Sequence, residues 1–206
     1  MGKMDEQIMV VDRKKLFSGN YFQGFSNSRP IDYEQRVLQN FLFMRRGDAE
    51  ANPEYKQPIG YVLIVNLAMK KIFAYRRSSA GGEGRLYEKW SWGVGGHIDL
   101  VDSAGENPIH ASIARELEEE VSVKINHLKV LGYINDDSNS VGKVHFGILY
   151  IAETDSEEVA PNSDEMAEGR LRTFEELNSI NSAPEYDVEE WSRISLEPLR
   201  VALARI

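Results

Sequence analysis

Four glutamates stand within five positions of this chain, in the segment ARELEEEVSV at residues 114–123. On a helix each residue turns about 100° from the last, so Glu116, Glu119 and Glu120 share one face. Glu118 lies about 200° from Glu116 and points away. Repulsion at these spacings costs only about 0.2–0.5 kcal/mol per pair, so a solvated acidic face is one interpretation. The other is a divalent cation, Mg²⁺ or Mn²⁺, held among the three carboxylates, because clustered oxygen ligands suit hard ions.

Composition limits the kind of protein this chain can be. Its 206 residues, 42% of them hydrophobic and 28% charged, suffice for one domain with an elaboration or for two small domains. The absence of cysteine excludes disulfides, thiolate metal sites and a cysteine nucleophile, and it is compatible with a reducing cytoplasm. Residues 1–15 lack the apolar run of a signal peptide, and no segment approaches the ~18–20 apolar residues of a membrane span. We therefore expect a soluble cytoplasmic protein with no membrane partner.

The net charge of −9 bears on the partner. A nucleic-acid polymer is bound through a positive field, so the charge argues against such a partner. It leaves room for a small phosphorylated ligand, which one cation and two or three arginines can hold.

Hydrophobic patterns predict a mixed sheet flanked by helices on both sides. Strands are predicted at residues 8–11, 61–66, 70–77, 89–96, 127–136, 142–153 and 170–174. Helices are predicted at 32–46, 108–121, 175–180 and 187–205, the last broken at Pro198. Asn107 is a natural cap for the acidic helix, and Pro108 suits its first position. Residues 47–58 are predicted to be a loop and to mark the seam between an N-terminal extension, 1–57, and a main domain, 58–206.

The acidic helix follows Gly95-Gly96, and together they resemble the Nudix (MutT-type) hydrolase signature. That signature reads glycine, five residues, glutamate, seven residues, then Arg-Glu-apolar-x-Glu-Glu-x-Gly-apolar. RELEEEVSV, residues 115–123, matches the second half except that Ser122 stands for the glycine. In the first half, nine residues separate Gly96 from Glu106 and eight separate Glu106 from Arg115. The loop thus carries a four-residue insertion, and the place of Glu106 in the signature is displaced.

The resemblance extends over residues 58–180, in which Glu165 matches a loop glutamate that precedes a strand and a short helix. The whole chain resembles a bacterial branch described as predicted MutT-type phosphoesterases. This resemblance implies a Nudix-type α/β/α sandwich with a mixed central sheet, to which residues 1–57 add an elaboration. Those residues either shape the pocket or form a homodimer contact, and the sequence does not choose between the two.

The resemblance also implies a Mg²⁺-dependent or Mn²⁺-dependent hydrolase that cleaves a diphosphate linkage in a nucleoside diphosphate derivative or a similar small metabolite. The implied metal ligands are Glu116, Glu119, Glu120 and the carbonyl of Gly96. Arg115 would orient Glu119 by a salt bridge, since it stands four residues earlier. The general base is Glu165 or Glu120, whereas Glu118 is expected to bind nothing.

Two further residues are candidates for substrate contact, His97 after the glycine pair and Arg85 in the glycine-rich loop 78–88. Trp90, Trp92 and two tyrosines, Tyr61 and Tyr75, are expected in the core. A Nudix-fold binding or regulatory protein without hydrolytic activity is the alternative, favoured slightly by the stretched loop and Ser122. A diphosphate isomerase on this fold usually needs a catalytic cysteine, which is absent.

Overall fold

The computed structural model describes residues 2–78 and 87–204 of the chain. Its residues group into two compact units. Unit 1 takes Met1–Tyr61, Gly95–Ala114 and Gly132–Leu149, and unit 2 takes Val62–Val94, Arg115–Leu131 and Tyr150–Ile206. Four elements have residues in both units, namely β4 (Tyr55–Asn66), β8 (His127–Asn135), β9 (His145–Glu153) and α4 (Pro108–Glu120).

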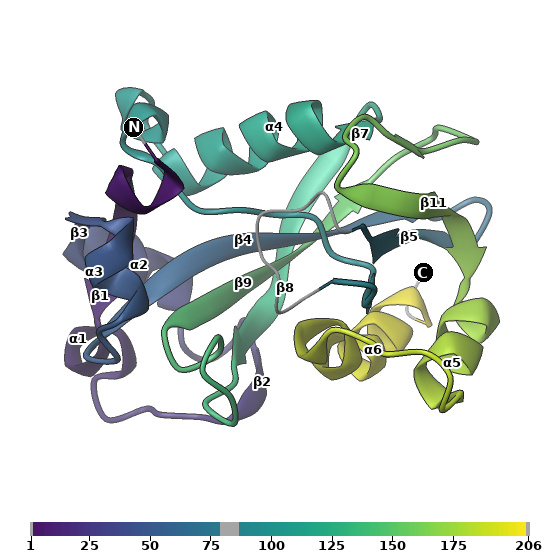
Figure 1. Cartoon of the computed structure of the whole chain (residues 1–206). Helices are drawn as coiled ribbons and strands as arrows, with labels where there is room; N and C mark the ends of the chain where they lie inside the picture. The colour runs from purple at the N-terminus through teal and green to yellow at the C-terminus, as the bar shows by residue number, and fades with distance from the viewer. Residues whose placement is uncertain (1, 79–86, 205–206) are drawn as a thin grey trace. The chain divides into compact units, whose positions relative to one another are not determined.

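Unit 1 places short helices around a group of antiparallel strands (Figure 1). Its strands are β1 (Gln7–Asp12), β2 (Gly24–Asn27) and β3 (Phe41–Arg45), besides parts of β4, β8 and β9. Its helices are α1 (Arg13–Phe17), α2 (Tyr33–Asn40), α3 (Arg46–Glu50) and the 3₁₀ turns η1 (Lys3–Asp5) and η3 (Leu100–Ala104). Strand β1 pairs with β3 and with β4, and β2 pairs with β8. The four apolar residues 8–11 of β1 are all buried, as suits a strand covered on both faces.

Unit 2 contains the predicted hairpin and the C-terminal helices. Its strands are β5 (Lys71–Arg77), β6 (Trp90–Ser91), β7 (Val121–Ser122), β10 (Ala160–Pro161) and β11 (Met166–Thr173), followed by α5 (Phe174–Ser182) and α6 (Glu190–Leu203). Strands β4 and β5 pair antiparallel, with Val65 opposite Ile72, so the hairpin prediction is confirmed. Strand β5 also pairs with β6 and β11. Trp90, Trp92 and Tyr75 are buried here, and Tyr61 is buried in unit 1, as predicted.

Three sequence predictions in unit 1 and around β6 were wrong. The helix predicted at 32–46 ends at Asn40, because Phe41–Arg45 pairs as β3 along the length of β1. The loop predicted at 47–58 contains the end of α3 and the start of β4. The strand predicted at 89–96 shortens to β6, with Val94 adding an isolated bridge to Val62. The boundary predicted between residues 57 and 58 stays a prediction.

Helix α6 corrects a fourth prediction, because it continues through Pro198. A proline inside a helix removes one backbone hydrogen bond and crowds the preceding turn. Leu196 and Leu199 are both buried on either side of it. Burying such side chains is worth roughly 1.5–3 kcal/mol each, which offsets the cost of the proline and keeps the helix in one piece.

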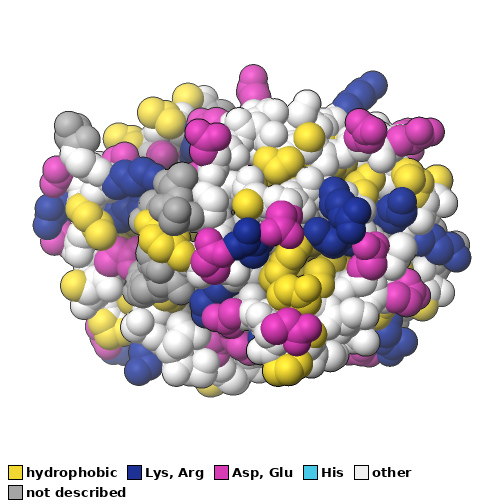
Figure 2. Space-filling view, turned by 45° about the vertical axis from the view of Figure 1, so that its right-hand side comes forward, with side chains coloured by type: hydrophobic (Ala, Val, Ile, Leu, Met, Phe, Trp, Pro, Cys, Tyr) yellow, Lys and Arg dark blue, Asp and Glu magenta, His cyan; other side chains and the backbone are white. Residues whose placement is uncertain are grey.

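No helix among residues 2–78 and 87–204 has both the length and the apolar character that crossing a membrane requires. On the face shown in Figure 2, basic and acidic side chains lie interspersed, with apolar groups between them. This face therefore does not present, in its described residues, the continuous positive surface that a nucleic-acid backbone would need.

Candidate active site

Helix α4 begins where the local signals place it. The side-chain oxygen of Asn107 accepts hydrogen bonds from the backbone N–H groups of Ile109, at 3.0 Å, and His110, at 3.2 Å. Pro108 occupies the first helical position, where its missing N–H leaves no hydrogen bond unmade. Ile113 and Leu117 are buried at a spacing of four residues. This buried stripe fixes the rotation of the helix about its axis and so the direction of each glutamate.

Arg115 joins two carboxylates of the acidic face, which we define as Glu116, Glu119 and Glu120. Its Nη1 atom donates to Oε1 of Glu116 at 2.7 Å and lies 3.5 Å from Oε2 of Glu119. The contact between Arg115 and Glu119 is the one that their spacing predicts. Burial raises the pKa of the Glu116 carboxyl; Arg115 opposes this shift, whereas the negative charges of Glu119 and Glu120 add to it. The negative charges of the acidic face thus act in the same direction as burial on the pKa of Glu116.

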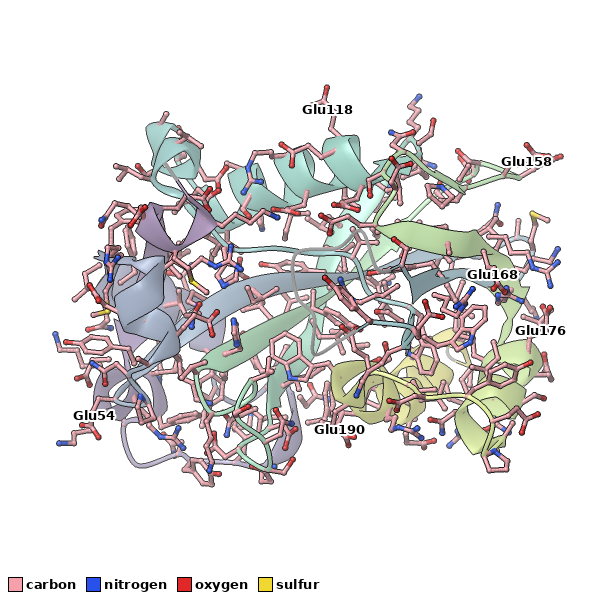
Figure 3. The ribbon with its side chains drawn as sticks, in the orientation of Figure 1. Glu54, Glu118, Glu158, Glu168, Glu176 and Glu190 are labelled. Atoms are coloured by element: carbon pink, nitrogen blue, oxygen red, sulfur yellow. The ribbon has the colours of Figure 1, made fainter. Side chains whose placement is uncertain are left out.

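Glu118 leaves the helix in another direction. Its side chain is exposed and points outward from α4 in Figure 3. Glu119 is exposed as well, but the guanidinium of Arg115 lies beside it. Glu116 and Glu120 are partly buried. Each residue turns about 100° from the last, and Ile113 and Leu117 face inward. Glu118 is therefore expected to be more exposed than Glu116 and Glu120, as observed.

The acidic loop between β9 and β11 is anchored to the end of α4. Strand β10 pairs with β7, with Ala160 opposite Ser122. The hydroxyl of Ser163 donates to Oε2 of Glu120 at 2.7 Å, and the hydroxyl oxygen of Ser163 accepts the backbone N–H of Glu165 at 3.3 Å. The carbonyl of Glu165 accepts the N–H of Ser78 at 2.9 Å. These bonds hold the loop that carries Glu165 beside the carboxylate of Glu120.

The sequence alone does not identify Ser163 as a partner of Glu120. The residue lies within a run of acidic and small residues, and nothing in its spacing distinguishes it from its neighbours. Its role depends on the pairing of β7 with β10, which joins segments about forty residues apart in the chain.

The departures from the Nudix signature are local. Ser122 is an exposed residue of β7 and is not among the described residues with positive φ, so a side chain fits there without strain. The lengthened loop 97–105 forms the 3₁₀ turn η3, in which the backbone N–H of Asp99 donates to Oδ2 of Asp102 at 2.8 Å. Glu106 is exposed in the loop before α4.

The glycine pair and His97 belong to unit 1. A Cβ atom on Gly95 would lie 2.2 Å from the carbonyl oxygen of Gly60, so the close approach of this segment to β4 requires glycine. His97 forms an isolated antiparallel bridge with Ile59 of β4. Arg85, the other candidate for substrate contact, lies outside the described residues.

The His97 ring lies in a cluster that the sequence did not predict. Its Nε2 atom is 2.7 Å from Oε1 of Gln57 and 3.2 Å from Nε2 of His145, and Glu50 completes the group. His145 follows His97 by 48 residues and Glu50 precedes it by 47. No short spacing could have revealed this group, because it is brought together by the pairing of distant segments.

The acidic face suits a hard divalent ion. It offers carboxylate oxygens alone, on consecutive turns of one helix, and such ligands match Mg²⁺ or Mn²⁺ better than softer metals. The raised pKa of Glu116 is what an ion would reverse, since a positive charge favours the ionised form. The residues present therefore fit the metal that the resemblance implies.

Comparisons with known proteins show the family and the fold of this chain. Residues 57–192 match the family model of the NUDIX domain. Protein YmaB of Bacillus subtilis is 42% identical over 158 residues, which cover 72% of this chain and 76% of YmaB. The crystal structure of Tm1382, described as a candidate Nudix hydrolase, aligns over 98% of this chain and 100% of its own, with 28% identity and a TM-score of 0.77.

A further solved structure shares the fold at low sequence identity. It is the NUDIX domain of Shewanella oneidensis NrtR, solved in complex with ADP ribose. It is 13% identical, covers 72% of this chain and 88% of its own, and has a TM-score of 0.56. The match to the NUDIX model spans well over half of the chain, and the fold has the expected α/β architecture with a large sheet and helices. This chain belongs to the Nudix family of hydrolases.

Proposed function

We propose that this protein is a divalent-metal-dependent hydrolase that cleaves a diphosphate linkage in a nucleoside diphosphate derivative or a similar small phosphorylated metabolite. The observation that carries the proposal is the acidic face, whose carboxylates gather on one side of α4 with Arg115 beside them. A pure binding protein has no need of three carboxylates at these positions. A homodimer and a cytoplasmic location are also part of the proposal.

In this proposal Glu116, Glu119 and Glu120 hold Mg²⁺ or Mn²⁺, with the backbone carbonyl of Gly96 as a further oxygen ligand. When bound, the ion supplies positive charge against the diphosphate oxygens and makes water easier to deprotonate. Arg115 acts by orientation: its guanidinium restrains the carboxylates of Glu116 and Glu119. A restrained ligand loses less entropy when it binds, which favours the bound state.

The general base is Glu165 or Glu120, and Glu165 is the first choice. Glu165 is partly buried, on a loop that Ser163 and Ser78 tie down through its backbone. Glu120 is the second choice, and its carboxylate accepts from the Ser163 hydroxyl. A base must come within hydrogen-bonding reach of the water that it deprotonates, and a backbone held at this point brings Glu165 toward the end of α4.

Two arguments support the proposed substrate class: the negative charge of a diphosphate and the ligand of a protein with the same fold. A dense negative charge is neutralised by one divalent ion and a few cationic groups, and Arg85 and His97 are the proposed contacts to the phosphates. The NUDIX domain of NrtR was solved with ADP ribose, a diphosphate that joins two sugar-containing groups. This makes ADP ribose a sensible first member of a substrate panel.

The test is a panel of nucleoside diphosphate derivatives incubated with Mg²⁺, with released phosphate measured after coupling to a phosphatase. The wild-type protein should release phosphate from at least one compound, and Glu120→Gln should lower that rate at least about a hundredfold. Binding of a compound by wild-type protein without hydrolysis of any would contradict the proposal and favour the binding or regulatory alternative.

A further inference from the structure

Unit 1 contains a second group of metal-ligating side chains that shares no residue with the acidic face. Glu50, His97 and His145 each direct one ligand atom to the same place, and these atoms all lie within 4.8 Å of one another. The Nε2 atoms of the two histidines are 3.2 Å apart. Oε1 of Glu50 is 3.9 Å from Nε2 of His97 and 3.8 Å from Nε2 of His145.

These separations are close to those of a coordination shell. Two ligands that bind zinc at about 2.0–2.1 Å in a tetrahedral arrangement lie roughly 3.3–3.4 Å apart. The two imidazole nitrogens already have this spacing, and the glutamate oxygen is about half an ångström too far. Glu50 is the last residue of α3, and its carboxylate would have to move by that distance to complete the shell.

The protonation of His145 favours metal binding. Its Nδ1 atom lies 2.8 Å from the carbonyl oxygen of Val141. A carbonyl can only accept, so Nδ1 carries a proton, and the neutral form of this ring presents the lone pair of Nε2 to His97 and Glu50. Metal-ligating histidines commonly have such a hydrogen bond from the other ring nitrogen, which fixes the tautomer and the orientation of the ring.

The surroundings hold the cluster rigidly and exclude most water. His145 is buried, Gln57 is fully buried, and the side chains of Glu50 and His97 are each 15% exposed. Lys56 Nζ donates to the carbonyl of His145 at 3.1 Å, and the N–H of Gln57 donates to the carbonyl of Val144 at 2.7 Å. The start of β9 is thus bonded to β4 on both sides of the histidine.

Gln57 places an amide oxygen beside the cluster. Its Oε1 lies 2.7 Å from Nε2 of His97, and its buried Nε2 has no hydrogen-bond partner among the described residues. One ring nitrogen therefore faces the lone pairs of an amide oxygen, a second imidazole and a carboxylate. A single proton on Nε2 can serve two acceptors at most, whereas a cation would attract all three.

We propose that Glu50, His97 and His145 form a binding site for a divalent transition metal of the zinc type, with the amide oxygen of Gln57 or a water as fourth ligand. Two imidazoles and one carboxylate are a ligand set of zinc and of iron(II) sites, and nitrogen ligands select such metals over Mg²⁺. Such a metal would connect α3, the segment after the glycine pair and β9 in unit 1. A metal bound here would occupy Nε2 of His97. The same atom could then not contact the phosphates of a substrate.

The test uses cobalt(II) as a coloured substitute for zinc, added to metal-free protein in excess Mg²⁺ so that oxygen-ligand sites are filled. Wild-type protein should bind one equivalent of cobalt with visible absorption typical of four or five ligands, and one equivalent of zinc should abolish this absorption. His145→Ala and Glu50→Gln should each weaken cobalt binding about a hundredfold.

The chain provides its own controls, since it has four histidines and only two are in the cluster. His110→Ala and His127→Ala should bind cobalt like wild type, because both residues are exposed. Glu119→Gln should also bind cobalt normally, which separates this site from the proposed catalytic one. Cobalt binding that is insensitive to His145→Ala, or no binding by wild type, would overturn the proposal.

A second measurement does not depend on whether the cluster variants fold. The imidazole proton resonances of wild-type protein are followed by NMR during zinc addition, and the His110→Ala and His127→Ala variants identify the two control signals. The other two signals should shift or broaden at one equivalent of zinc. If all four signals respond equally, or only the two control signals respond, the assignment to His97 and His145 is wrong.

Discussion

Glu118 and Glu119 are neighbours in α4, and their side chains leave the helix on different faces. Glu119 has the guanidinium of Arg115 3.5 Å from its carboxylate, whereas Glu118 points outward from the helix. The same side chain can thus form an ion pair or remain a solvated charge, depending on its angle about the axis. At the scale of single residues, function follows from direction as much as from chemical type.

Ser163 provides a prediction at this scale. Ser163→Ala removes the hydroxyl that donates to Glu120 and accepts from the backbone of Glu165. A hydrogen bond to a charged group contributes about 1.5 kcal/mol, so kcat/KM should fall roughly tenfold. The measurement is kcat/KM in Mg²⁺ with a substrate found in the panel.

Ser122→Ala is the matched control, because Ser122 is an exposed serine on β7, the strand that pairs with β10. Its kcat/KM should equal that of wild type. Equal losses in the two variants, or a loss in Ser163→Ala that is accompanied by a lower Tm, would contradict the role given to the Ser163 hydroxyl.

At the scale of elements, the start of α4 was predictable because its signals are local. Asn107 and Pro108 are adjacent to the helix they begin, and the glutamates follow at helical spacing. Strand β3 was not predictable in this way. Phe41–Arg45 is a strand because β1 supplies its hydrogen-bonding partner, and that partner lies about thirty residues earlier in the chain.

The Asn107 cap gives a prediction about the helix as a whole. Asn107→Ala leaves the N–H groups of Ile109 and His110 without their side-chain acceptor. The free energy of unfolding should fall by about 1 kcal/mol in urea denaturation. Asn107→Asp keeps an acceptor at the cap and should stay within about 0.5 kcal/mol of wild type. A loss as large in Asn107→Asp would show that the cap is not the cause.

Asp137 ties together two elements of unit 1. It accepts from Nζ of Lys56 in β4 at 2.8 Å and pairs with the guanidinium of Arg13 in α1. Burial alone would raise the pKa of Asp137, but hydrogen bonds from Arg13, Lys56 and Tyr21 hold it well below its usual range. Burial lowers the pKa of Lys56 to about 8, although Asp137 acts in the opposite direction. The carboxylate is therefore needed to keep a buried ammonium group charged.

Asp137→Asn should destabilise the protein by about 3 kcal/mol at pH 7, because it leaves a buried charge without its counter-ion. In wild type, the contribution of a carboxylate with a lowered pKa is complete above pH ~4 and is lost as the pH falls below it. This acid-sensitive part should be absent in the variant. The measurement is the free energy of unfolding against pH from 7 to 3.

Asp48→Asn is the control for this prediction, since Asp48 forms an exposed pair with Arg45. It should change stability little at any pH. Parallel stability curves for wild type and Asp137→Asn between pH 7 and pH 3 would contradict the account of Asp137.

At the scale of the whole molecule, the family and the α/β class could be predicted, because a short contiguous signature carries them. The match to residues 57–192 and the fold confirm both. The cluster of Glu50, His97 and His145 could not be predicted, since its members are dispersed over 96 positions of the chain. Ligands on separate strands and helices meet only when tertiary pairing is known.

In the proposed function a divalent ion binds the acidic face, and the direction of each glutamate side chain decides whether that residue is a ligand. The most direct measurement is a calorimetric titration with Mn²⁺, in the presence of a non-hydrolysable diphosphate analogue, of wild type, Glu119→Gln and Glu118→Gln. Wild type and Glu118→Gln should bind with equal affinity, whereas Glu119→Gln should bind at least about tenfold more weakly. Equal affinity in all three proteins, or an absence of binding in wild type, would contradict the claim.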